Sequence, residues 1–153
     1  MPEIFIPKQF YQELTRICVN ALPHKAFGLV GGTDIYHPTT IYPCKTNLRN
    51  EPEWKHLFES FGEFYLDPDL GFVISHPEVK AVMEAIDSHS ESFVGVFHSH
   101  RKLKAEPSEI DICLNSDPGL LSYIVSVINP SAPELGVFHL NGGTYQTIPV
   151  IRY

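Results

Sequence analysis

The sequence predicts an α+β fold in which a mixed β-sheet lies between helices. Amphipathic stretches with helical spacing alternate along the chain with short β-rich runs, and a glycine-rich turn marks a hairpin near the C-terminus. No repeat or linker divides the 153 residues. We therefore expect one domain, residues 1–153, which is large enough to bury a core.

The first third of the chain predicts one helix and two strands. A helix begins near Pro7 and ends before Pro23, because the apolar residues between them recur on one helical face. Residues 26–32 are apolar and end in a Gly-Gly turn, which is typical of a strand. Residues 35–46 combine β-branched residues with prolines, and we expect an edge strand there.

Residues 47–75 are rich in aromatic side chains. We expect a short helix over residues 53–61 and an extended stretch to Leu66. Disorder is unfavourable here, because aromatic surface gains from burial. An exposed aromatic patch that binds a partner is the functional alternative.

A second helix is predicted from Ser75, a good cap residue followed by a proline and an acid in the first turn. Its expected buried face comprises Val79, Val82, Met83 and Ile86.

The remaining elements form an alternating series of strands and one helix. Residues 93–97 predict a buried strand, and a third helix is expected from Ser108. Residues 121–128, 135–140 and 144–151 are β-rich. The last two runs flank Asn-Gly-Gly, a strong hairpin signal.

Charge and composition exclude several classes of protein. A net charge of −7 argues against a general nucleic-acid binder, and the longest apolar runs are too short to cross a membrane. The N-terminus has no export signal, so we expect a cytoplasmic protein. Cys18, Cys44 and Cys113 show no CxxC spacing, and we expect buried thiols in a reducing compartment.

Two histidines directly follow the predicted strand at residues 93–97. His98 and His100 are separated by one residue, and Ser108 and Asp111 come next at a fixed spacing. Two imidazoles and a carboxylate are the ligand set of a catalytic zinc, which keeps a fourth position for water. Ser108 and Asp111 also have the spacing of a capping box, but by chance the whole pattern arises in roughly one chain per thousand. The sequence therefore predicts a metal site.

The pattern His98-Ser99-His100, seven residues, Ser108, two residues, Asp111 resembles that of the JAMM (MPN-plus) zinc metalloprotease family. The resemblance extends over nearly the whole chain. It implies a curved mixed β-sheet flanked by helices, similar in layout to the cytidine deaminases. The deaminase signature itself is absent, which sets base deamination aside.

The resemblance also implies roles for these residues. His98, His100 and Asp111 would hold one Zn²⁺ with a water as fourth ligand, and Ser108 would stabilise the oxyanion. Ser99 would orient the loop. Family substrates are bonds after the C-terminal Gly-Gly of ubiquitin-like or sulfur-carrier proteins, so such a tail is the expected partner, with no nucleic acid and no membrane. A homodimer is left open.

One position departs from the family pattern. The general-base glutamate of the family corresponds to Lys25 here, and a protonated lysine cannot accept a proton from water. Another carboxylate could serve instead, with Glu106 as the nearest candidate in sequence, or Lys25 could mark an altered form of an active enzyme. The alternative to a metallopeptidase is a metal-binding, catalytically weak or inactive domain that recognises a protein. Arg101 is a milder departure, since the family usually has proline there.

The segment from Arg101 to Lys104 is basic. It is either a solvated loop or a source of positive charge beside the metal site, where it would attract an acidic partner.

Overall fold

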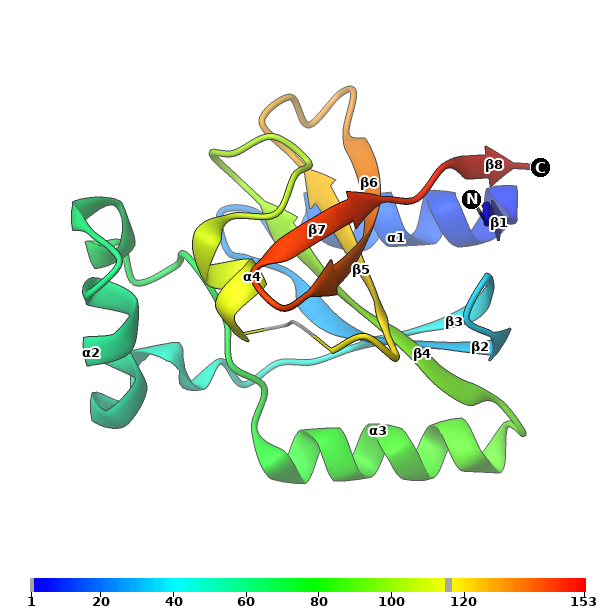
Figure 1. Ribbon diagram of the computed structural model, residues 1–153, viewed down its shortest axis with the longest axis horizontal. Coiled ribbons are helices and arrows are strands. Elements are labelled where there is room, and N and C mark those ends of the chain that lie inside the picture. The colour runs from blue at the N-terminus through cyan, green and yellow to red at the C-terminus, as the bar shows by residue number, and fades with distance from the viewer. Residues whose placement is uncertain (1, 115–116) are drawn as a thin grey trace.

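The computed structural model describes residues 2–114 and 117–153. A six-stranded mixed sheet lies between helices, which confirms the predicted α+β class. Helices α1 and α3 lie on opposite sides of this sheet, and α2 lies further out, at one end (Figure 1).

The elements follow one another along the chain as β1 (Ile4–Ile6), α1 (Lys8–Asn20), β2 (Phe27–Asp34), β3 (His37–Pro43), η1 (Leu48–Asn50), α2 (Pro52–Glu59), η2 (Glu63–Leu66), α3 (His76–Ser88), β4 (Ser92–His100), α4 (Glu109–Leu114), β5 (Leu121–Ser126), β6 (Glu134–Asn141), β7 (Thr144–Thr147) and β8 (Val150–Arg152). The two η segments are short 3₁₀ helices.

The strand order of the large sheet is β3-β2-β4-β5-β6-β7, with β3 at one edge as predicted. Only β4 and β5 run parallel among these described pairs. In the antiparallel pair of β2 and β4, Phe27 lies opposite His98. The start of β2 therefore meets the end of β4, and this meeting point carries the candidate site.

The main core lies between α1 and the sheet. Phe10 and Leu14 of α1 pack with Val30 of β2 and Phe97 of β4, and all four are buried. This packing fixes the central strands against a rigid layer, because close-packed side chains leave little room for displacement.

The other face is less tightly covered than predicted. Ser75 caps α3 by accepting a hydrogen bond from the backbone N–H of Glu78 at 3.4 Å, as expected. Of the predicted buried face of α3, however, only Ile86 is fully buried. The other three positions are half-buried, because the helix lies beside an open apolar crevice; these are Val79, Val82 and Met83.

Three predictions of an element's bounds or type were wrong. The strand predicted to end at residue 97 continues to His100, because β4 keeps its pairing with β5 up to that residue. The stretch before Leu66 is a 3₁₀ helix rather than extended. The C-terminal run divides into β7 and β8, and β8 leaves the large sheet to pair in parallel with β1, a strand that was not predicted.

The aromatic segment is partly buried and partly exposed. Phe58 and Tyr65 are buried, whereas Phe64 is 43% exposed. Cys18 and Cys44 are buried as expected, but the prediction for Cys113 was wrong, because it lies exposed on the short helix α4. No helix in the described part of the chain is long and apolar enough to span a membrane.

Candidate metal centre

His98, His100 and Asp111 come together at the end of β4. Alternate residues of a strand point to the same face, so the two imidazoles lie side by side, with ring centroids 4.9 Å apart. Helix α4 brings Asp111 to them. The three side chains are buried, and their ligating atoms all lie within 4.8 Å of one another.

A capping box fixes the carboxylate at the start of α4. The Ser108 backbone N–H donates to Asp111 Oδ2 at 2.9 Å, and the Asp111 N–H donates to Ser108 Oγ at 3.3 Å. Capping by Ser108 and Asp111 is therefore compatible with a metal site, because Asp111 Oδ1 remains free to face His98.

The spacing of the ligating atoms fits a tetrahedral ion. His98 Nε2 lies 3.1 Å from His100 Nε2 and 3.1 Å from Asp111 Oδ1, and His100 Nε2 lies 3.1 Å from Asp111 Oδ2. Ligands about 2.0–2.1 Å from a zinc ion in tetrahedral geometry lie about 3.3 Å from one another. Each of these pairwise distances is close to that value, with the two histidines facing different oxygens of Asp111; taken as one atom per residue, the ligating atoms lie within 4.8 Å of one another.

The protonation states also suit a metal. Burial lowers the pKa of His98 to about 4, which keeps its imidazole neutral. Burial alone would raise the pKa of Asp111, but the two histidines hold it well below its usual range, so the carboxylate is ionised. A metal binds neutral imidazole and ionised carboxylate.

A backbone carbonyl sets the tautomer of one ligand. His100 Nδ1 lies 2.7 Å from the carbonyl of Lys104 and donates to it, which leaves Nε2 as the unprotonated atom that faces the triad. His98 Nδ1 is buried and has no hydrogen-bond partner among the described residues. The ring of Phe72 packs against His98, with centroids 4.9 Å apart, and shields this ligand from water.

Ser99 ties the end of β4 to the start of β2. Its Oγ accepts from the Ala26 N–H at 2.8 Å, and its own N–H donates to the Ala26 carbonyl at 2.9 Å. The Ser99 carbonyl accepts from Lys25 Nζ at 2.8 Å. Lys25 thereby lies beside the triad, where it lines the same pocket as His100 and Asp111.

Burial lowers the pKa of Lys25 to about 8, although the nearby charges of Asp111 and Asp69 act in the opposite direction. In the metal-free protein the side chain is therefore mainly a cation at neutral pH. It donates its proton to a carbonyl rather than accepting one.

The basic segment after His100 is held by acids. Arg101 lies 3.2 Å from Asp67 and 2.9 Å from Asp69, and Lys102 lies 2.6 Å from Asp67. The charges of Arg101 and Lys102 are thus partly compensated, and they fasten the segment 67–69 next to the metal ligands.

Two adjoining hollows lie beside the triad; His100 and Asp111 line the inner one, whereas His98 lines neither. The triad pocket is small and includes Lys25, Tyr65, His100, Ser108 and Asp111. The outer groove has a volume of about 580 Å³ and continues from it through shared residues; it includes Phe64, Tyr65, Lys102, Lys104, Glu106 and Ile128.

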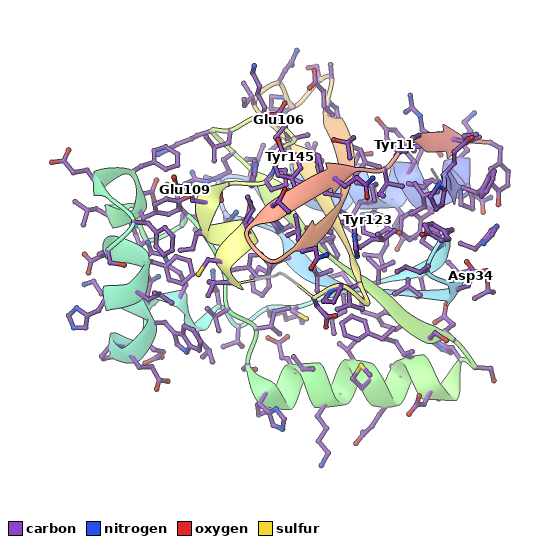
Figure 2. The ribbon with its side chains drawn as sticks, viewed as in Figure 1. Tyr11, Asp34, Glu106, Glu109, Tyr123 and Tyr145 are labelled. Carbon is purple, nitrogen blue, oxygen red and sulfur yellow. The ribbon has the colours of Figure 1, made fainter. Side chains whose placement is uncertain are left out.

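Glu106 does not line the triad pocket. It is exposed, and it lines the outer groove on the loop that precedes α4 (Figure 2). The structure thus separates this candidate base from the ligands. The sequence had not pointed to Tyr65, Phe72 or the Lys104 carbonyl, since no motif distinguishes an aromatic wall or a backbone acceptor.

The profile of the prokaryotic homologs of the JAB domain matches residues 7–138. The chain belongs to this family. The predicted resemblance to JAMM and MPN proteins is therefore confirmed, and the JAB domain occupies most of the sequence, from the residue before α1 into β6.

Solved structures share this fold. A protein from Desulfitobacterium hafniense is 24% identical, with a TM-score of 0.76 over 98% of this chain and 92% of that chain. A protein from Salinibacter ruber is 22% identical, with a TM-score of 0.61 over 97% of this chain and 91% of that chain. A JAB1/MPN domain protein from Archaeoglobus fulgidus is 15% identical, with a TM-score of 0.54 over 99% and 100%.

A further structure, described as a JAMM metalloprotease-like zinc site in the proteasome and signalosome, is 14% identical, with a TM-score of 0.54 over 98% of this chain and 99% of that chain. At these identities the likenesses concern the fold alone. No curated protein matches the chain.

Proposed function

We propose that this JAB domain is a zinc-dependent metallopeptidase or isopeptidase that acts after the C-terminal Gly-Gly of a ubiquitin-like or sulfur-carrier protein, in the cytoplasm. The observation that carries the proposal is the triad of His98, His100 and Asp111, whose ligating atoms lie within 4.8 Å of one another. The pKa values of His98 and Asp111 are both lowered, which suits a neutral imidazole and an ionised carboxylate.

A zinc ion held there supplies an acidified water and polarises the scissile carbonyl. The residues of the chain hold the ion and surround the reacting group. Asp111, His98 and His100 would hold the ion, and the Phe72 ring packs against His98, which is fully buried. The Ser108 hydroxyl lies at the wall of the same pocket, where it can donate to a developing oxyanion.

The outer groove supports a peptide tail as the substrate. It leads into the triad pocket and combines exposed apolar side chains, Phe64 and Ile128, with the basic residues Lys102 and Lys104. An extended chain that ends in two glycines would fit the small triad pocket, since glycine has no side chain.

The second candidate function is a domain that binds metal and recognises a protein without hydrolysing it. Lys25 favours this reading, because its ammonium group is engaged by the Ser99 carbonyl where the family has a proton acceptor.

Hydrolysis of a Gly-Gly-linked model substrate by the zinc-loaded protein and by Lys25→Glu separates the two functions. Comparable activity in both supports the metallopeptidase and refutes the recognition domain. Activity in the variant alone supports the recognition domain. Lys80→Glu, which makes the same charge change on the exposed face of α3, is the control and should behave like the unaltered protein.

A further inference from the structure

Tyr65 lies at the junction of the triad pocket and the outer groove. It comes from the 3₁₀ helix η2, its side chain is 8% exposed, and it lines both hollows together with Ser108. No sequence motif pointed to it. A buried phenol that borders a metal triad is a candidate for chemistry, because its hydroxyl is polar and its position is fixed.

The position of Tyr65 is fixed from both ends. Its backbone carbonyl accepts from the guanidinium of Arg49, which also donates to the Leu70 carbonyl at 2.7 Å and is only 1% exposed. Its ring packs edge-on against Phe61 and Phe64, at centroid distances of 6.0 and 5.5 Å. The buried arginine therefore holds this wall of the pocket, and the aromatic contacts orient the ring.

The surroundings of the hydroxyl determine what it can do. The Ser108 hydroxyl and the Ile110 backbone N–H both act to lower the pKa of the phenol, as groups that can donate to its oxygen do. A phenol has acceptor lone pairs and a single proton. When the oxygen accepts from these two donors, its own proton is left for a third group, and the pocket beside His100 and Asp111 is where that group would lie.

The protonation state agrees with a donor role. Burial raises the pKa of Tyr65 above its ordinary value, although the contacts with Ser108 and Ile110 oppose this in part. The phenol is therefore protonated at neutral pH. Ser108 Oγ in turn accepts from the Asp111 N–H at 3.3 Å, which leaves the serine proton free to point at the phenol.

We propose that Tyr65 donates a hydrogen bond to an anionic oxygen bound at the triad, and that Ser108 positions the phenol for this contact. The role of Tyr65 in hydrolysis rests on the proposed function. In that reaction, the oxygen that accepts the hydrogen bond is the carbonyl oxygen of the scissile bond as it gains negative charge. The Ser108 hydroxyl has a single proton, so it supports the oxyanion through the phenol while it donates to Tyr65, and directly only when it does not.

The test uses acetohydroxamate, a small anion that ligates zinc and needs no peptide substrate. Its affinity for the zinc-loaded protein is measured by calorimetry, and the zinc content of each variant is checked first. Tyr65→Phe removes only the hydroxyl and should weaken binding about 10-fold or more, because hydrogen bonds to charged groups are worth this much. Tyr36→Phe, on the turn after the far end of β2, is the matched control and should bind as the unaltered protein does.

Hydrolysis of the Gly-Gly-linked substrate provides a second readout. Tyr65→Phe should lower kcat by about 100-fold and leave KM nearly unchanged, which a general loss of structure would not do. If no protein hydrolyses the substrate while Tyr65→Phe alone weakens acetohydroxamate binding, the proposed function fails and the donor role of Tyr65 stands. Unchanged acetohydroxamate affinity in Tyr65→Phe, equal weakening in Tyr36→Phe, or no binding by the unaltered zinc-loaded protein would each overturn the inference.

Discussion

Ser99 shows how one side chain can position a whole site. It lies between His98 and His100, is fully buried, and bonds to Ala26 through both its Oγ and its N–H. Its carbonyl holds the ammonium group of Lys25. Because these contacts join the end of β4 to the residues before β2, the ligands and Lys25 cannot move independently.

Ser99→Ala should therefore destabilise the protein by about 1–3 kcal/mol, since the Ala26 N–H is left buried without an acceptor. Urea unfolding measures the difference. Ser122→Ala is the matched control, because Ser122 Oγ is also buried but has no hydrogen-bond partner among the described residues, so its loss should cost little. Equal destabilisation by the two changes would contradict this account of Ser99.

The triad could be predicted from the sequence, because the types of its residues and the spacing between them are enough to suggest a metal site. The outcome at Glu106 was different. It is near the ligands in sequence, yet it lines the outer groove, because the chain turns away after His100 before it returns at Ser108. Sequence distance does not give the path of a loop, and the role of Tyr65 depends on a segment that begins far away along the chain.

At the scale of elements, the paired strands β2 and β4 are held at the end opposite the site by a buried carboxylate. Glu91, the residue before β4, accepts from the hydroxyls of Thr39, Thr40 and Tyr42, with a distance of 2.6 Å from Thr40. Its side chain is 9% exposed. This network joins β3 to the turn after α3, and so ties the edge of the sheet to the strand that carries the ligands.

Burial alone would raise the pKa of Glu91, but the three hydroxyl donors and His89 hold it below its usual range. A lowered folded-state pKa gives stability that is present above the unfolded value, about 4.3, and is lost as the pH falls through the folded value. Glu91→Gln should thus lower the free energy of unfolding by about 2 kcal/mol at pH 7, and by less below about pH 4.

Chemical denaturation across this pH range measures the effect. Glu84→Gln, an exposed position on α3, is the control and should change stability little at any pH. A difference between Glu91→Gln and the unaltered protein that stays constant from pH 7 to pH 3 would argue against a stabilising carboxylate.

Element type was predictable where the periodicity was strong, and boundaries were not. The helices α1 and α3 and the hairpin of β6 and β7 follow from local pattern, the hairpin because Gly142 and Gly143 both adopt positive φ. Strand β1 escaped prediction, because its three residues between prolines form a strand only by pairing with β8 at the other end of the chain. Such a contact leaves no local signal.

At the scale of the whole molecule, the JAB fold brings together pieces that are distant in sequence. Lys25 precedes β2, the histidines end β4, Asp111 lies on α4, and Tyr65 lies on η2. The sheet and the Arg49-anchored segment hold these pieces rigidly. The net charge of the chain is −7, whereas the outer groove combines Lys102 and Lys104 with the single acid Glu106.

The central claim is that His98, His100 and Asp111 hold one zinc ion. The most direct test is the zinc content per chain, measured by mass spectrometry on protein purified without chelators. We predict one zinc per chain in the unaltered protein and in the control His56→Ala, on the exposed face of α2, and none in His98→Ala. Unaltered protein without zinc, or His98→Ala that keeps a full equivalent, would contradict the account.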